Sequence, residues 1–227
     1  MSKTISLLFI ILSVVLVGCS PQSSQEIQKN NQLNESNSKT EDVINIVAFG
    51  DSLTAGYGLN ISDAYPKQLE TYLRNNGYNV KVYNSGLSGE TTSAALSRVN
   101  WVMHLNPDIV ILETGANDAF RGIDLNLTKT NIEKIVDIFE EKNVTVILAG
   151  IEMVENLGPD YVNKFENIYP EVSKNKNITL IRKFLGGVAG IEELNQKDRI
   201  HPTPEGYSII VQKNIGPVVE EVLNKNK

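Results

Sequence analysis

A serine lies in a glycine-rich turn, Gly50-Asp51-Ser52-Leu53, directly after an apolar run of the chain. The turn lacks the Gly-Lys-Ser/Thr ending of a phosphate loop and the Gly-X-Ser-X-Gly spacing of a nucleophile elbow. One interpretation is a capped tight turn without chemistry. The other is a nucleophilic Ser52 at the start of a helix, where backbone N–H groups and the helix dipole favour an anion.

A nucleophilic serine needs a base, and the chain has two histidines, His104 and His201. His104 ends a segment of helical period, and we interpret it as a residue at a helix C-terminus. His201 lies in a loop three positions after Asp198, so that Asp198 can accept from Nδ1–H while Nε2 faces a serine. The alternative for this loop is a solvated turn. Asp198 and His201 are therefore the predicted partners of Ser52.

Acyl transfer also needs donors that stabilise an oxyanion, and loops after two further strands can supply them. Gly89 lies in the loop after the second predicted strand, where a glycine lets backbone N–H groups approach a substrate closely. Asn117 lies in the loop after the third, and its side-chain amide is a donor. With the backbone N–H of Ser52, these residues form the predicted oxyanion hole.

The elements that must position these residues alternate between short apolar runs and longer segments of helical period. This order predicts an α/β fold with a three-layer, doubly wound, five-stranded parallel sheet, whose functional crevice lies beyond the carboxyl ends of the strands. We predict strands over 44–49, 80–84, 108–113, 144–149 and 178–182, and helices over 64–76, 91–104, 128–142, 160–174 and 204–224.

Four blocks of this sequence together resemble the SGNH (GDSL) hydrolases: Gly50-Asp51-Ser52-Leu53, Gly89, Gly115-X-Asn117-Asp118 and Asp198-X-X-His201-Pro202. The chain is most similar to the bacterial arylesterase, thioesterase I and lysophospholipase group. The resemblance implies a flavodoxin-like fold, a Ser52-Asp198-His201 triad, and an oxyanion hole of Ser52, Gly89 and Asn117. One departure is Arg199, where relatives commonly carry glycine; we expect its cation to keep Asp198 ionised.

The resemblance implies a serine esterase that hydrolyses short- to medium-chain carboxylic esters through an acyl-enzyme on Ser52, with no cofactor and no metal. Loops at residues 119–123 and 153–159 are candidates for lining an acyl groove, and their apolar members are equally interpreted as ordinary packing. Two alternatives are open. One is a carbohydrate O-acetylesterase acting on cell-envelope polysaccharide, and the other is a lipoprotein that binds a ligand without catalysis.

Composition limits the possible partners. The chain has 227 residues, 41% of them hydrophobic, which predicts one globular domain. A formal net charge of -6 argues against a nucleic-acid partner. The single cysteine, Cys19, excludes an intramolecular disulfide and a cysteine-based zinc cluster. We expect a monomer that acts on a small-molecule ester or lipid.

The first 42 residues predict export. Residues 1–18 have one cation, Lys3, and then an apolar run too short for a comfortable membrane span, which is typical of a signal peptide. The run ends at Cys19 in a sequence that resembles the bacterial lipobox, so we predict lipidation of Cys19. Residues 19–42 are rich in Ser, Gln and Asn and predict a flexible tether, followed by the hydrolase domain at 43–227. The protein is therefore predicted to be an exported lipoprotein anchored in a membrane of the cell envelope.

Overall fold

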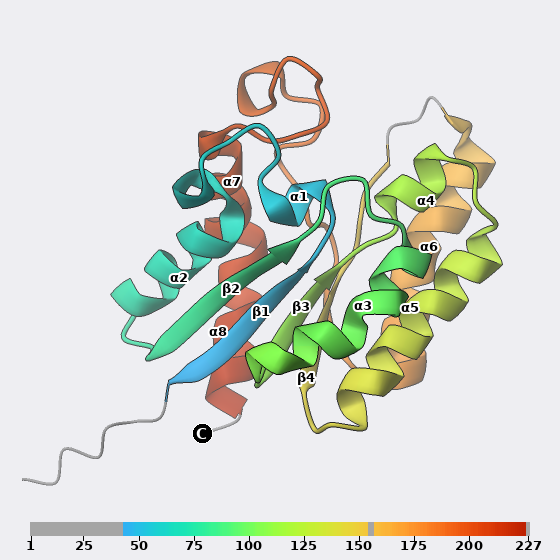
Figure 1. Cartoon of the computed structure of the whole chain (residues 1–227). Helices are drawn as coiled ribbons and strands as arrows, with labels where there is room; N and C mark the ends of the chain where they lie inside the picture. Colours follow the sequence, from blue (N-terminus) through green and yellow to red (C-terminus); the bar gives the residue numbers. More distant parts are fainter. Residues whose placement is uncertain (1–42, 154–156, 226–227) are drawn as a thin grey trace, which may run out of the picture. The chain divides into compact units, whose positions relative to one another are not determined.

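Five parallel strands form one sheet in the order β2-β1-β3-β4-β5 (Figure 1). The structure is a computed structural model and describes residues 43–153 and 157–225. The predicted α/β class and the five-stranded parallel sheet are confirmed. The strands are β1 (Ile44–Gly50), β2 (Val80–Gly86), β3 (Ile109–Glu113), β4 (Thr145–Ala149) and β5 (Thr179–Ile181).

The sheet forms because its central strands are apolar on both faces. All five residues of β3 are buried, as are the last five of β1 and the last four of β4. Strands of this kind need cover on both sides, which parallel sheets obtain from crossover helices. The edge strand β2 instead alternates buried residues with more exposed ones, among them Lys81. A continuous apolar run cannot lie at a surface with one face in water. The runs in β1, β3 and β4 therefore predicted central strands of a covered sheet.

The register of the sheet determines where the loops meet. Gly50 of β1 lies between Gly86 of β2 and Glu113 of β3 at the carboxyl edge. The loops that follow these three strands therefore start side by side. They are the loops in which the sequence places Ser52, Gly89 and Asn117.

Helices cover both faces of the sheet and complete the three layers (Figure 1). One face carries α2, α7 and α8, and the other carries α3, α5 and α6. The bounds are α2 (Tyr65–Asn75), α3 (Thr92–Val102), α5 (Leu125–Glu140), α6 (Pro159–Lys176), α7 (Pro204–Ile210) and α8 (Gly216–Lys225). Short 3₁₀ turns lie at Ile61–Asp63, Met103–Leu105 and Glu192–Leu194.

Two features of the helices differ from the prediction. The helix expected over 204–224 is divided by a π-helical turn at Val211–Ile215, after which Gly216 packs against Tyr72; a Cβ on Gly216 would lie 2.5 Å from the Tyr72 ring. The second feature is α4 (Ala116–Phe120), a short helix in a segment predicted as a loop, whereas α1 (Ser52–Ala55) is the helix start expected at Ser52. Four or five residues are too few to show a helical period.

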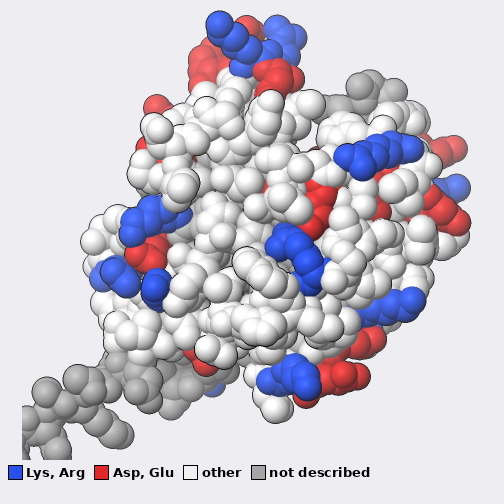
Figure 2. All heavy atoms as spheres, viewed as in Figure 1, with Lys and Arg blue, Asp and Glu red and all other residues white. Residues whose placement is uncertain are grey.

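The surface seen in Figure 2 carries acidic and basic side chains interspersed, with no broad area of one sign on that face. Within residues 43–153 and 157–225, each helix is too short or too polar to cross a bilayer. The predicted signal peptide at 1–18, Cys19 and the tether at 19–42 lie outside the described residues.

Candidate active site

Ser52 is the first residue of α1, directly beyond the end of β1. Asp51 caps this helix, because its Oδ1 accepts from the Leu53 N–H at 3.0 Å. The helix lies close against β2: a Cβ on Gly86 would come within 2.1 Å of the Ala55 backbone nitrogen. The sheet edge therefore holds the Ser52 backbone in one place.

A chain of hydrogen bonds joins the three predicted triad residues. The distance from His201 Nε2 to Ser52 Oγ is 2.8 Å, and the distance from His201 Nδ1 to Asp198 Oδ2 is 2.7 Å. The second carboxylate oxygen of Asp198 accepts from the backbone N–H groups of Ile200 and His201, each at 3.0 Å. The predicted contact between imidazole and hydroxyl is thus present, and it is the arrangement that activates a serine hydroxyl.

The pKa of Asp198 lies below its ordinary value. Burial raises this pKa, but the hydrogen bonds from the His201 and Ile200 backbone and from the imidazole together outweigh it. Arg199, which we expected to keep Asp198 ionised, instead points its guanidinium toward Glu192 at 3.8 Å. Its φ of 61° lies in the left-handed region that glycine adopts freely, so this position is compatible with the glycine that the resemblance leads us to expect there.

Two side chains fasten the His201 loop to the Ser52 turn, and neither was predicted. Gln196 Nε2 donates to the Tyr57 carbonyl oxygen, and the Tyr207 hydroxyl donates to the Leu53 carbonyl oxygen, both at 2.8 Å. The Tyr57 ring also packs on the imidazole of His201, with 4.8 Å between ring centroids. In Figure 1 the segment between β5 and α7 accordingly arches over the sheet edge beside α1. Spacing alone does not show such contacts, because they join segments far apart in the chain.

The two predicted oxyanion residues lie on neighbouring loops that bind each other. Asn117, in α4, donates from Nδ2 to Asp51 Oδ2 at 3.0 Å, which brings it to the residue next to Ser52. Gly89 has a φ of 79° and accepts at its carbonyl oxygen from Arg121 Nη2 at 2.7 Å. Arg121 follows the last residue of α4, so this short helix and the residue after it contact both the Asp51 turn and the Gly89 loop.

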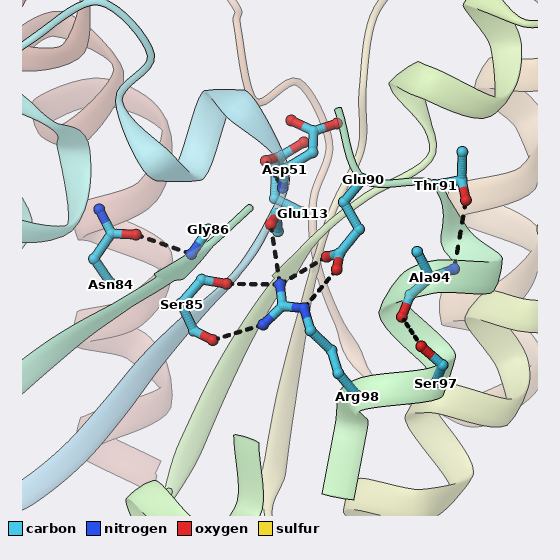
Figure 3. A network of polar contacts seen from close by, with 11 residues as sticks. Asp51, Asn84, Ser85, Gly86, Glu90, Thr91, Ala94, Ser97, Arg98 and Glu113 are labelled. Carbon is cyan, nitrogen blue, oxygen red and sulfur yellow. Dashed lines mark hydrogen bonds and ion pairs between the residues drawn. The ribbon is translucent and has the colours of Figure 1, made fainter. Parts of the chain in front are cut away.

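A buried ion pair supports the Gly89 loop (Figure 3). Arg98, on α3, binds both carboxylate oxygens of Glu90, with Nε–Oε1 at 2.5 Å and Nη2–Oε2 at 2.7 Å. The same guanidinium donates to the hydroxyl and the carbonyl oxygen of Ser85 in β2, both at 2.9 Å. It therefore ties the residue after Gly89 to the end of β2. A weak signal for this role in the sequence is a single cation in a helix whose other side chains are uncharged.

An apolar cavity of about 390 Å³ opens beside the triad. It is lined by Leu53, the neighbour of Ser52, and by Asp198 and Ile200 from the histidine loop. Phe120 and Met153 come from the two loops predicted to line an acyl groove. Of the second of those loops, residues 154–156 lie outside the described part of the chain.

His104 takes no part in this arrangement. It lies exposed in the 3₁₀ turn that follows α3, where its Nδ1 is 3.2 Å from the Trp101 carbonyl oxygen. This position agrees with our interpretation of His104 as a helix-terminal residue.

Comparison with known proteins, like the geometry of the site, indicates an ester hydrolase. The chain is 30% identical to an arylesterase of Vibrio mimicus over 89% of this chain and 94% of that protein. It is 29% identical to the thioesterase 1/protease 1/lysophospholipase L1 of Escherichia coli K12, over 77% of this chain and 84% of that protein. The crystal structure of TesA superimposes with a TM-score of 0.75 at 28% identity, covering 78% of this chain and 99% of that one. Residues 48–209 match the GDSL-like lipase/acylhydrolase family, and the chain belongs to that family.

Proposed function

We propose that this enzyme, a carboxylic ester hydrolase, acts as a serine esterase on esters with short to medium acyl chains. The observation that supports the proposal is the continuous hydrogen-bond chain from Ser52 Oγ through His201 to Asp198. In this proposal Ser52 is the nucleophile, His201 is the general base, and Asp198 orients the imidazole and stabilises its cation.

The reaction has two half-reactions. Ser52 Oγ attacks the ester carbonyl carbon while its proton passes to His201 Nε2. The tetrahedral intermediate then expels the alcohol, which takes that proton, and an acyl-enzyme remains. Water attacks the acyl carbon with His201 again as base, and the acid leaves. The oxyanion of each intermediate is bound by the N–H groups of Ser52 and Gly89 and by the Asn117 amide.

The cavity beside Ser52 supports an alkyl or aryl acyl group. Its volume of about 390 Å³ lies toward the small end of small-molecule sites, which span about 300–1,000 Å³. Most of the side chains lining it are apolar, and they surround the residue next to the nucleophile. A sugar O-acetylesterase would instead need polar groups for the carbohydrate, so this alternative has less support. The intact hydrogen-bond chain disfavours a protein that only binds a ligand.

We propose further that the enzyme is exported and held at a membrane by lipid on Cys19. The support is the sequence: an apolar signal that ends at the one cysteine, followed by a polar segment. Several acyl chains on one residue give stable anchoring. Acyl-CoA esters are cytosolic, so lysophospholipids and exogenous esters are the better candidates for its substrates, and a relative carries lysophospholipase in its name.

Replacing Ser52 tests the proposed nucleophile. Ser52→Ala should lower kcat on p-nitrophenyl butyrate by at least about 10⁴-fold, because no other group can form the acyl-enzyme. The melting temperature should stay unchanged. Ser97→Ala, which removes an exposed hydroxyl from α3, is the matched control and should keep full activity. A Ser52→Ala enzyme with parental activity would refute the function proposed here.

Asp198→Asn tests the orienting carboxylate and its pH dependence. Loss of the acceptor for Nδ1–H should lower kcat by about 10²- to 10⁴-fold. The lowered pKa of Asp198 means that its ionised form stabilises the fold at pH values above the unfolded pKa, near 3.8. The stability gap between parent and variant should thus shrink as the pH falls below about 4, where the carboxylate of the parent becomes protonated. Urea unfolding between about pH 5 and pH 3 measures the gap, and one that grows on acidification over this range would contradict the assignment.

Phe120→Ala tests whether the cavity binds the acyl chain. The ring is about half exposed and lines the cavity, so its removal should lower kcat/KM by about tenfold for p-nitrophenyl octanoate. For p-nitrophenyl acetate, kcat/KM should fall by less than about twofold. Leu127→Ala is the control, since Leu127 is equally exposed, at 46% against 47%, but does not line the cavity. Equal losses for both esters would show that the chain binds elsewhere.

Cys19→Ser tests the anchor. In a bacterial host that processes lipoproteins, the parent should sediment with membranes and incorporate labelled fatty acid. The variant should lose the label, because serine cannot form the thioether that carries the lipid. Ser20→Ala serves as the control at the neighbouring position and should behave as the parent does. Labelled fatty acid on the Cys19→Ser protein would place the lipid on another residue.

A further inference from the structure

Two carboxyl groups are buried directly beneath the proposed nucleophile. The exposed fractions of Asp51 and Glu113 are 1% and 0%. Among the described residues, neither makes an ion pair with a lysine or arginine. Two ionised carboxylates sealed together without a cation would be strongly unfavourable. The pair therefore keeps one proton at neutral pH.

The hydrogen bonds show which carboxyl group is ionised. Both oxygens of Asp51 act as acceptors: Oδ1 for the Leu53 N–H and Oδ2 for the Asn117 amide, each at 3.0 Å. On Glu113 only Oε2 accepts, from Thr54 Oγ1 at 2.8 Å and from the Asp51 N–H at 3.3 Å. Glu113 Oε1 is buried and has no partner among the described residues. Asp51 is thus arranged as an anion, and Glu113 has an oxygen free to carry the proton.

The electrostatics of the surroundings agree with this division. Burial raises the pKa of Asp51 to about 6, although hydrogen bonds from the Leu53 N–H and the Asn117 amide oppose the rise. Burial and the neighbouring Asp51 charge raise the pKa of Glu113 well above its ordinary range.

The other titratable or charged groups around the pair are the phenols of Tyr65, Tyr169 and Tyr207, whose pKa values burial raises, together with His201, Asp118 and Arg98. Arg98 forms its ion pair with Glu90 instead.

We propose that Asp51 is a positioning residue for Asn117: its carboxylate accepts one amide hydrogen and thereby fixes the other toward the oxyanion, while Glu113 carries the single proton of the buried pair. An amide side chain can rotate by half a turn, which exchanges its oxygen and nitrogen. In the rotated form the Asn117 oxygen would face the Asp51 carboxylate, and that repulsion disfavours the rotation. The inference rests on the proposed function, because it concerns the oxyanion of that reaction.

A double-mutant cycle tests whether Asp51 acts through Asn117. The variants are Asp51→Asn, Asn117→Ala and the combination, assayed for kcat on p-nitrophenyl butyrate. Loss of one oxyanion donor costs about 10²- to 10³-fold in kcat. We expect Asn117→Ala to show this loss, Asp51→Asn to lose about 10²-fold, and the double variant to be within about threefold of Asn117→Ala. Losses that multiply in the double variant would overturn the proposal.

Asp51→Ser separates positioning from helix capping and serves where Asp51→Asn folds poorly. Serine is a good N-cap for α1, but it is too short to reach the Asn117 amide. We expect Asp51→Ser to keep the parental melting temperature to within a few degrees and to lose about 10²-fold in kcat with KM nearly unchanged. Parental kcat in Asp51→Ser would show that Asp51 only caps the helix.

Infrared spectroscopy tests the proton on Glu113. The parent at pH 7 should show the carbonyl band of a protonated carboxylic acid, and Glu113→Gln should lack it. A parent without this band would overturn the assignment of the proton. These results are distinct from a failure of the proposed function, which would appear as full activity in Ser52→Ala or as no labelling of Ser52 by a fluorophosphonate. The double-mutant cycle is therefore measured with enzyme that the fluorophosphonate labels at Ser52.

Discussion

The hydrogen bond between Ser52 Oγ and His201 Nε2 is the contact on which the proposed chemistry depends, and it joins residues 149 positions apart. No strand or long helix carries His201, so its loop must obtain rigidity from hydrogen bonds. Within the loop, the Gln196 N–H donates to the His201 carbonyl oxygen at 2.7 Å. Between segments, Gln196 and Tyr207 donate to the carbonyl oxygens of Tyr57 and Leu53, both of which follow Ser52 in the chain. These side chains, together with a single antiparallel bridge between Asn195 and Pro202, hold the imidazole in place, as a site of fixed geometry requires.

The parallel register imposes a second constraint, because it crowds three strand ends beneath the nucleophile. A Cβ on Gly50 would lie 2.3 Å from the Glu113 carbonyl oxygen, and one on Gly86 would overlap α1. Only glycine fits at these two positions. The same crowding buries the Asp51 and Glu113 carboxyl groups, and two negative charges buried close together are less favourable than one. Tight packing and the unusual electrostatics of the site therefore have one cause.

The sequence predicted the sheet well because its central strands are buried on both faces and so consist of apolar runs. The bounds of β1, β3 and β4 each differ from the prediction by one residue. The grouping of Ser52, Gly89 and Asn117 was predictable because these residues follow strands whose carboxyl ends meet at one edge, whereas the triad contact was predicted from the spacing of Asp198 and His201 and from the family resemblance. The π turn at Val211–Ile215 was not, since it depends on how Gly216 packs against Tyr72. Nor was the pairing of Arg98 with Glu90, because Glu90 lies in the loop before α3 and eight positions separate the two residues.

The loops that carry the proposed oxyanion donors are joined by polar contacts, and the reason lies in their composition. They are short and rich in glycine, so they offer little apolar surface whose burial would fix them. Hydrogen bonds to charged groups supply direction instead: Arg121 donates to the Gly89 carbonyl oxygen, the Thr92 N–H donates to Asp118 at 2.8 Å, and Arg98 donates to Glu90. Buried charged groups such as Asp118 and Glu90 contribute little net stability and are costly when a partner is missing. Their value here is geometric, since a donor displaced by a fraction of an ångström no longer meets the charge that forms in the transition state.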